Sequence, residues 1–161
     1  MPSYTGVLGS FVPAPSNASP LALQKGESAY LFGTLATTAT QLPVNDQNVA
    51  LEAAPAGVTG ASIAVNLQAG SEGQPPPMVT VEIRFSAAPG AGEIIAIQEA
   101  DTDADGFYIT PSASAYTVTV FDAVKFTARV DLSPTGGKFL RVLRTKGANA
   151  VTCTVKVTRL A

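Results

Sequence analysis

The chain has 161 residues, of which 46% are hydrophobic and only 14% are charged, and its formal net charge is −2. This length suits one domain with a single core. The sequence contains no histidine, no tryptophan and one cysteine, Cys153, which excludes Ser-His and Cys-His nucleophile pairs, imidazole metal ligands and disulfides within the chain.

The first 27 residues are rich in Pro, Ser, Ala and Gly and show no sustained period, so we expect residues 1–27 to be an extended N-terminal arm. The arm is either a disordered tail or a segment that lies along a neighbouring subunit. The first cation is Lys25 and four prolines interrupt the preceding stretch, so the sequence predicts neither a secretory signal nor a membrane span. The predicted folded domain covers residues 28–161.

The first half of this domain contains short alternating segments separated by Gly and Pro. The pattern predicts a first strand over Ser28–Thr37. It predicts a second strand in which the side chains of Ile63, Val65 and Leu67 lie on the same face. In Val79–Phe85, apolar and polar residues alternate, which is typical of a half-buried strand. The turn residues 89–92 then predict a hairpin between this strand and a strand over Glu93–Ala100.

The second half continues the pattern, and its closely spaced strands predict a meander. The predicted strands are Tyr116–Phe121, Phe126–Leu132, Lys138–Arg144 and Val151–Val157. The whole chain therefore has about eight strands. We expect an all-β protein, an antiparallel two-sheet sandwich, with a jelly roll among the topologies that fit.

Two local motifs have a chemical and a structural interpretation. Asp101, Asp103 and Asp105 precede Gly106 and match the start of a calcium loop, but Ser112 stands where the loop needs Glu. We therefore expect a solvated acidic turn and no metal. Gly136-Gly137-Lys138 lacks the other residues of a phosphate-binding loop and predicts a hairpin turn.

Cys153 belongs to the apolar face of a strand, which predicts a core cysteine and not a nucleophile. Without histidine, and without a recognisable catalytic pattern, we expect a protein that is not an enzyme and uses no cofactor.

Charge is divided unevenly along the chain. Residues 1–122 hold two cations against eleven acids, and residues 123–161 hold eight cations against Asp131 alone. The two parts attract, so the charges either balance within one pair of sheets or form a basic face that docks on an acidic partner. The candidate interface residues are Lys125, Arg129, Arg141 and Arg144, although Arg141 and Arg144 are three apart and point to opposite faces of a regular strand. Overall acidity argues against nucleic acid as a partner.

The proline-rich arm, the low charge, the run from Glu99 through Phe107 to Thr110 and the closing segment 126–159 together resemble capsid cement or decoration proteins of tailed bacteriophages. The resemblance implies a jelly-roll-like protein on the exterior of the virion, made in the host cytoplasm. It also implies binding to the major capsid protein, stabilisation of the shell and a homo-oligomer, commonly a trimer. Two alternatives stay open: a phage tail-tube, baseplate or fibre domain, and a carbohydrate-binding β-sandwich module.

Overall fold

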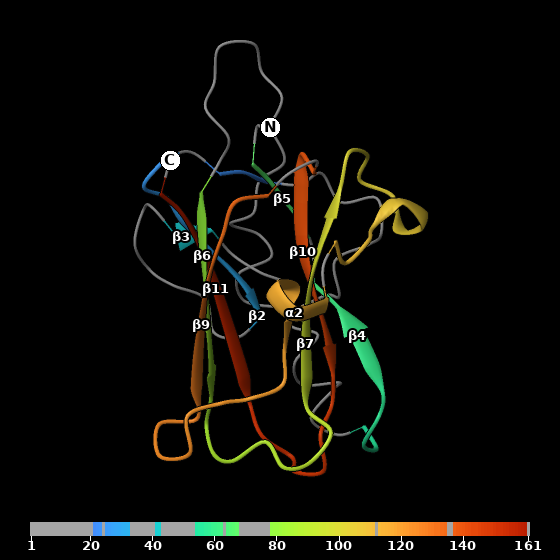
Figure 1. Cartoon of the computed structure of the whole chain (residues 1–161), viewed down its shortest axis with the longest axis vertical. Helices are drawn as coiled ribbons and strands as arrows, with labels where there is room; N and C mark the ends of the chain where they lie inside the picture. Colours follow the sequence, from blue (N-terminus) through green and yellow to red (C-terminus); the bar gives the residue numbers. More distant parts are fainter. Residues whose placement is uncertain are drawn as a thin grey trace, which may run out of the picture.

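The computed structural model describes residues 21–23, 25–32, 41–42, 54–62, 64–67, 78–111, 113–134 and 137–160. These residues form two sheets packed face to face, which Figure 1 shows edge-on. Sheet A contains, in spatial order, β1 (Leu21–Ala22), β5 (Val65–Asn66), β10 (Phe139–Thr145), β7 (Ile94–Ala100) and β8 (Thr117–Val118), and β4 (Thr59–Ala61) also pairs with β10. Sheet B contains β3 (Gln41–Leu42), β2 (Ser28–Phe32), β11 (Cys153–Arg159), β6 (Val79–Phe85) and β9 (Thr127–Leu132). The predicted all-β sandwich is confirmed.

The strands are paired as one long hairpin that has been rolled up. Four antiparallel pairs are nested inside one another: β7 with β8, β6 with β9, β5 with β10, and β2 with β11. Successive pairs fall in alternate sheets, so sheet B has the order β2-β11-β6-β9 and sheet A the order β5-β10-β7-β8. This nested order is that of a jelly roll, and the tip of the long hairpin is the segment between β7 and β8.

Two connections differ from the prediction. The predicted hairpin between Val79–Phe85 and Glu93–Ala100 is wrong, because β6 lies in sheet B and β7 in sheet A. The predicted meander is wrong for the same reason, since β8, β9, β10 and β11 alternate between the sheets. The predicted strand Tyr116–Phe121 is also shorter, because a single helical turn, α2 (Ala113–Tyr116), precedes the two residues of β8. Alternation of apolar residues identifies a strand and its buried face but not its partner.

The core lies between the sheets and is built by the inward-facing residues of the long central strands. On β6 these are Val79, Val81, Ile83 and Phe85, and they meet their counterparts on β7, β10 and β11. Cys153 is fully buried among them, in agreement with the prediction of a core cysteine. Burial of this apolar surface is the main stabilising contribution to the fold.

A second, smaller cluster forms where the segment after β7 folds back beside sheet A. The covering segment, residues 101–110, contains the 3₁₀ turn η2 (Asp105–Phe107) and buries Tyr108 with Ala64 and Ala100. Half-buried Phe139 packs against this cluster. Gly137 is required nearby, because a Cβ atom there would lie 2.4 Å from the Cβ of Glu99. Its role is thus close packing. The predicted hairpin turn is wrong, since β9 lies in sheet B and β10 in sheet A, and Gly136 lies outside the described residues.

The predicted arm is described only in part. Residues 1–20 and residue 24 lie outside the described residues. Leu21–Ala22 forms β1, paired parallel to β5, and Leu23 is fully buried in the core. The Arg159 guanidinium donates hydrogen bonds to the carbonyls of Leu23 and Leu67. The folded body therefore includes residues before the predicted boundary at residue 27.

The nested pairing also explains the uneven charge. It brings the acidic first part of the chain against the basic last part, and three of the four ion pairs among the described residues join these two parts: Arg141 with Asp105, Arg144 with Glu93, and Lys156 with Glu82. Balance within the sheets, one of the two interpretations of the charge pattern, accounts for these six residues.

Candidate functional site

The four predicted interface cations do not form one surface. Arg144 faces the interior together with Leu140 and Val142 and has no exposed surface, so its prediction as an interface residue is wrong. Its guanidinium donates to the Glu93 carboxylate, 2.6 Å from Nε to Oε1, and to the Val151 carbonyl. Successive side chains of a strand point to opposite faces, so Arg144 lies on the buried face of β10 and Arg141, three residues earlier, lies on the outer face.

Arg141 lies on the outer face of sheet A but is largely covered by the covering segment. Its side chain is 12% exposed, its guanidinium carbon lies 3.9 Å from the centre of the Tyr108 ring, and it pairs with Asp105. Gln98 accepts a further hydrogen bond from its Nε. Arg141 therefore holds the covering segment in place and offers little surface to a partner.

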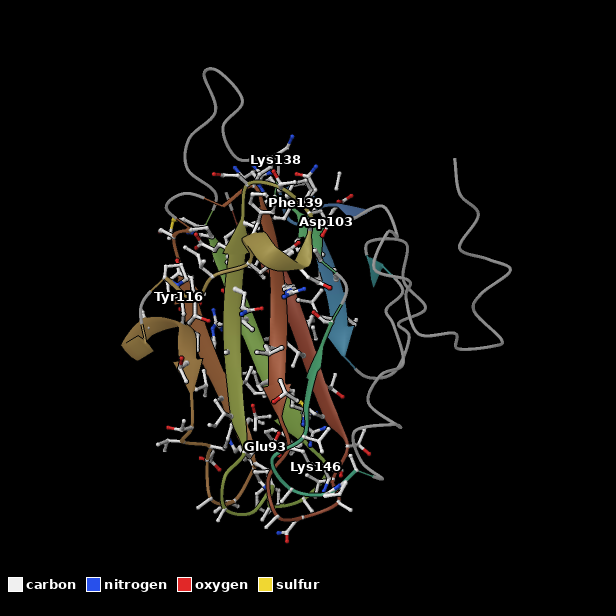
Figure 2. All side chains as sticks on the ribbon, turned by 90° about the vertical axis from the view of Figure 1, so that its right-hand side faces the viewer. Glu93, Asp103, Tyr116, Lys138, Phe139 and Lys146 are labelled. Carbon is white, nitrogen blue, oxygen red and sulfur yellow. The ribbon has the colours of Figure 1, made fainter. Side chains whose placement is uncertain are left out.

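The acidic run in the covering segment is engaged by the protein's own side chains. Asp103 accepts a hydrogen bond from the Tyr108 hydroxyl, and Asp105 pairs with Arg141. Burial, reinforced by Asp103, raises the pKa of the Tyr108 phenol. Within the described ranges no group of three His, Cys, Asp or Glu side chains is arranged to hold a metal ion. Figure 2 shows Asp103 at the upper end of the sandwich, near Lys138 and Phe139.

The other two predicted cations remain exposed on the side of sheet B. Arg129 projects from β9 with 61% of its side chain accessible, and it pairs with Asp131 of the same strand. Lys125 is exposed in the connection that leads into β9. Of the four predicted interface residues, Arg129 and Lys125 are thus accessible to a partner. Lys125 lies in a segment with further exposed residues.

This segment, residues 119–126, is the β8–β9 loop, and it is held by its own backbone. Asp122 Oδ1 accepts hydrogen bonds from the amides of Val124 and Lys125, and the Asp122 carbonyl accepts from the Phe126 amide. The Asp122 amide donates to the Thr127 carbonyl. Such turns, in which an Asp side chain caps the following amides, fix a loop locally. The amide hydrogen bonds, that of Lys125 first, lower the pKa of the Asp122 carboxyl.

Two phenylalanines anchor the β8–β9 loop to the body. Phe121 meets Phe85 of β6 edge to face, with 4.9 Å between ring centres, and Phe126 packs against the core. Phe126 has φ of 54°, the one positive φ outside glycine among the described residues. A bulky residue in the left-handed region is strained, and such strain persists where the surrounding structure enforces it, commonly at binding sites.

The anchored loop presents two valines to solvent. Val120 is 82% exposed and Val124 is 81% exposed, the largest values among the exposed large apolar residues of the described part. The sequence prediction missed both, because Val120 was placed within a strand and Val124 carried no pattern of its own. A detectable signal was Asp122, whose side chain typically caps a turn at the start of a loop. The candidate site is therefore Val120, Val124 and Lys125 on a preorganised loop.

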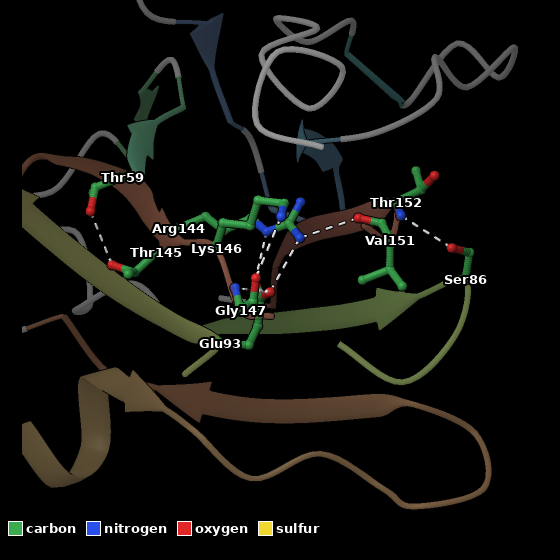
Figure 3. A network of polar contacts seen from close by, with 9 residues as sticks. All are labelled: Thr59, Ser86, Glu93, Arg144, Thr145, Lys146, Gly147, Val151 and Thr152. Atoms are coloured by element: carbon green, nitrogen blue, oxygen red, sulfur yellow. Dashed lines mark hydrogen bonds and ion pairs between the residues drawn. The ribbon is translucent and has the colours of Figure 1, made fainter. Parts of the chain in front are cut away.

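A buried polar network lies at the lower end of the sandwich, where Figure 2 labels Glu93 and Lys146, and Figure 3 shows it from close by. Glu93 accepts from Arg144 and, through Oε2, from the Gly147 amide. The Arg144 guanidinium also lies 5.4 Å from the ring of Phe85, the residue that holds Phe121. A buried pair satisfied in this way favours one arrangement of the connections it joins.

Neither a protein-family model nor a curated protein matches the chain. Within the described residues, no helix is long and apolar enough to cross a membrane.

Proposed function

We propose that the protein is a structural virion protein, a capsid cement or decoration protein that binds the shell of the major capsid protein from outside and stabilises it. The proposal rests on the resemblance of the sequence and on the β8–β9 loop. The loop exposes two valines beside Lys125 while Asp122 and two phenylalanines fix its shape. An apolar contact that is ordered before binding loses little conformational entropy when the complex forms.

The proposed contact is small, so stable attachment needs several copies acting together. Symmetric oligomers provide this multivalency, because each additional loop binds at a high effective concentration. We propose a homo-oligomer, with a trimer as the expected form, which light scattering of the purified protein tests. The role requires no active site and no cofactor.

The decisive experiment is co-sedimentation with shells assembled from the major capsid protein of the same genome. A Val120→Asp, Val124→Asp double variant removes the apolar contact, and we expect its affinity for shells to fall at least tenfold, about 1.4 kcal/mol or more, as for central interface residues. Both side chains are exposed, so the thermal unfolding temperature stays close to that of the unmodified protein.

The matched control is Val58→Asp, because Val58 is also an exposed valine, at 40%, but precedes β4 of sheet A. It is expected to bind shells normally. Full binding by the double variant, or no binding by the unmodified protein, contradicts the proposal.

A further inference from the structure

The outer face of sheet B carries a groove that the β8–β9 loop does not use. It has a volume of about 550 Å³ and crosses β2, β11, β6 and β9. Most of its lining consists of the outward-facing side chains of these four strands, and the core residue Ile83 and the half-buried Ala128 complete it. It is therefore a feature of the regular sheet and not of a single connection.

The strand register arranges the groove as two rows of side chains. In the first row, Tyr30 pairs with Lys156, Lys156 with Glu82, and Glu82 with Arg129, so one residue comes from each strand. Three strand spacings of about 4.8 Å give this row a length of about 14 Å. The second row lies beside it and contains Thr154, Arg84 and Thr127 in the same register.

The two rows carry a net positive charge. The three cations Arg84, Arg129 and Lys156 face a single lining carboxylate, that of Glu82, which pairs with Lys156. Arg129 pairs with Asp131 on the edge strand β9. The pKa of the Asp131 carboxyl is lowered, mainly by the hydrogen bond that it accepts from the Thr80 hydroxyl. Arg84 is exposed and forms none of the ion pairs found within the described ranges. The groove therefore favours an anionic ligand and keeps at least one guanidinium free to bind a carboxylate or sulfate.

The other lining groups distinguish a saccharide from a peptide. A peptide laid on this sheet face cannot bind by strand addition, because the amides and carbonyls of the central strands are already paired within the sheet. Sugar hydroxyls, in contrast, both donate and accept, and the hydroxyls of Thr127 and Thr154 and the Glu82 carboxylate match them. Tyr30 at one end offers an aromatic ring to the apolar face of a sugar.

We propose that this groove binds a short acidic oligosaccharide, with Arg84 holding a carboxylate or sulfate group and Tyr30 packing against a sugar ring. This site is separate from the β8–β9 loop, so it stands or falls independently of shell binding.

The experiment is calorimetric titration of the full-length protein with trigalacturonate, with neutral maltotriose and with a triglutamate peptide. Trigalacturonate is expected to bind, with amide shifts at the groove in an isotope-labelled sample, and the other two are expected to bind at least tenfold more weakly. Arg84→Ala reduces affinity for trigalacturonate by roughly tenfold or more, as for loss of a charge-assisted hydrogen bond. Tyr30→Ala reduces it by roughly threefold to tenfold.

Lys138→Ala is the matched control, since it also removes one exposed cation, but Lys138 directly precedes β10 of sheet A and lies over the Phe139 ring. It is expected to bind trigalacturonate as the unmodified protein does. Equal binding of triglutamate indicates an acidic peptide site and overturns the proposal. Absence of binding by trigalacturonate, or an equal loss in Lys138→Ala, overturns it as well.

Discussion

On sheet A the arginines of β10 are committed to acidic side chains of the same chain, whereas on sheet B Arg84 and Arg129 remain at the solvent boundary. Arg144 is buried against Glu93, and Arg141 is covered by residues 101–110. Arg84 and Arg129 of sheet B stay exposed. The nested hairpin thus uses part of the basic second half to close its own structure and leaves the rest available. Positive charge in the sequence is a guide to binding only where the fold has not already neutralised it.

The largest effect is expected from breaking the buried pair of sheet A. Arg144→Met leaves the Glu93 carboxylate buried, with the Gly147 amide as its remaining donor among the described residues, and loss of one partner from a buried pair costs about 3–5 kcal/mol of unfolding free energy. Urea denaturation measures this loss. Adding Glu93→Leu should restore part of it, because the unpaired charge is removed while the Gly147 amide and the Val151 carbonyl still lack their partners. A loss below about 1 kcal/mol in Arg144→Met contradicts this interpretation.

A moderate effect is expected from uncovering the outer face of sheet A. Arg141→Ala removes the contact with the Tyr108 ring and the hydrogen bond to Gln98, and the expected cost is about 1–2 kcal/mol. The pair with Asp105 adds little, since that carboxylate is mostly exposed. Arg129→Ala on sheet B is the control and should cost less in the same denaturation series. Equal losses in the two variants would remove the distinction between the sheets.

The smallest effect concerns the loop that leads into sheet B. The hydrogen bonds from the loop amides lower the pKa of the Asp122 carboxyl in the folded state. They therefore stabilise the loop fully at pH values above the ordinary Asp pKa near 4. This stabilisation is lost as the pH falls through the lowered pKa. The amide signals of Val124 and Lys125 should therefore shift with a midpoint below 4, with little change in the unfolding temperature at neutral pH. Asp122→Asn removes this titration. A midpoint at or above the ordinary Asp value is the contrary result.

The positions of the strands follow largely from the local alternation of apolar and polar residues, whereas the choice of partner strands does not. Val79–Phe85 alternates so regularly that the predicted strand coincides with β6, and Phe126–Leu132 differs from β9 by one residue. Which strands pair depends on contacts distant in sequence, such as β2 with β11, that no short window contains. For this reason a hairpin and a meander were predicted where the chain crosses between sheets.

The candidate site was predictable only in part. Lys125 and Arg129 were identified from charge and remain accessible, but the same reasoning included Arg144, whose parity with Leu140 and Val142 indicates burial. The exposure of Val120 and Val124 results from the tertiary contacts that bury part of Phe121 and Phe126 against the body. A periodic pattern in the local sequence could not predict it.

The position of β11 also determines when the protein can fold during its synthesis. β11 lies between β2 and β6 in the middle of sheet B, and β10 occupies the corresponding place between β5 and β7 in sheet A. A nascent chain that has not yet released residues 153–159 from the ribosome lacks the strand on which β2 and β6 meet. Folding of this domain is therefore expected to follow translation of β11 and to be slow, as is typical of topologies dominated by distant pairings. Until then, the apolar faces of β2 and β6 depend on chaperones or on rapid completion of the chain for protection from aggregation.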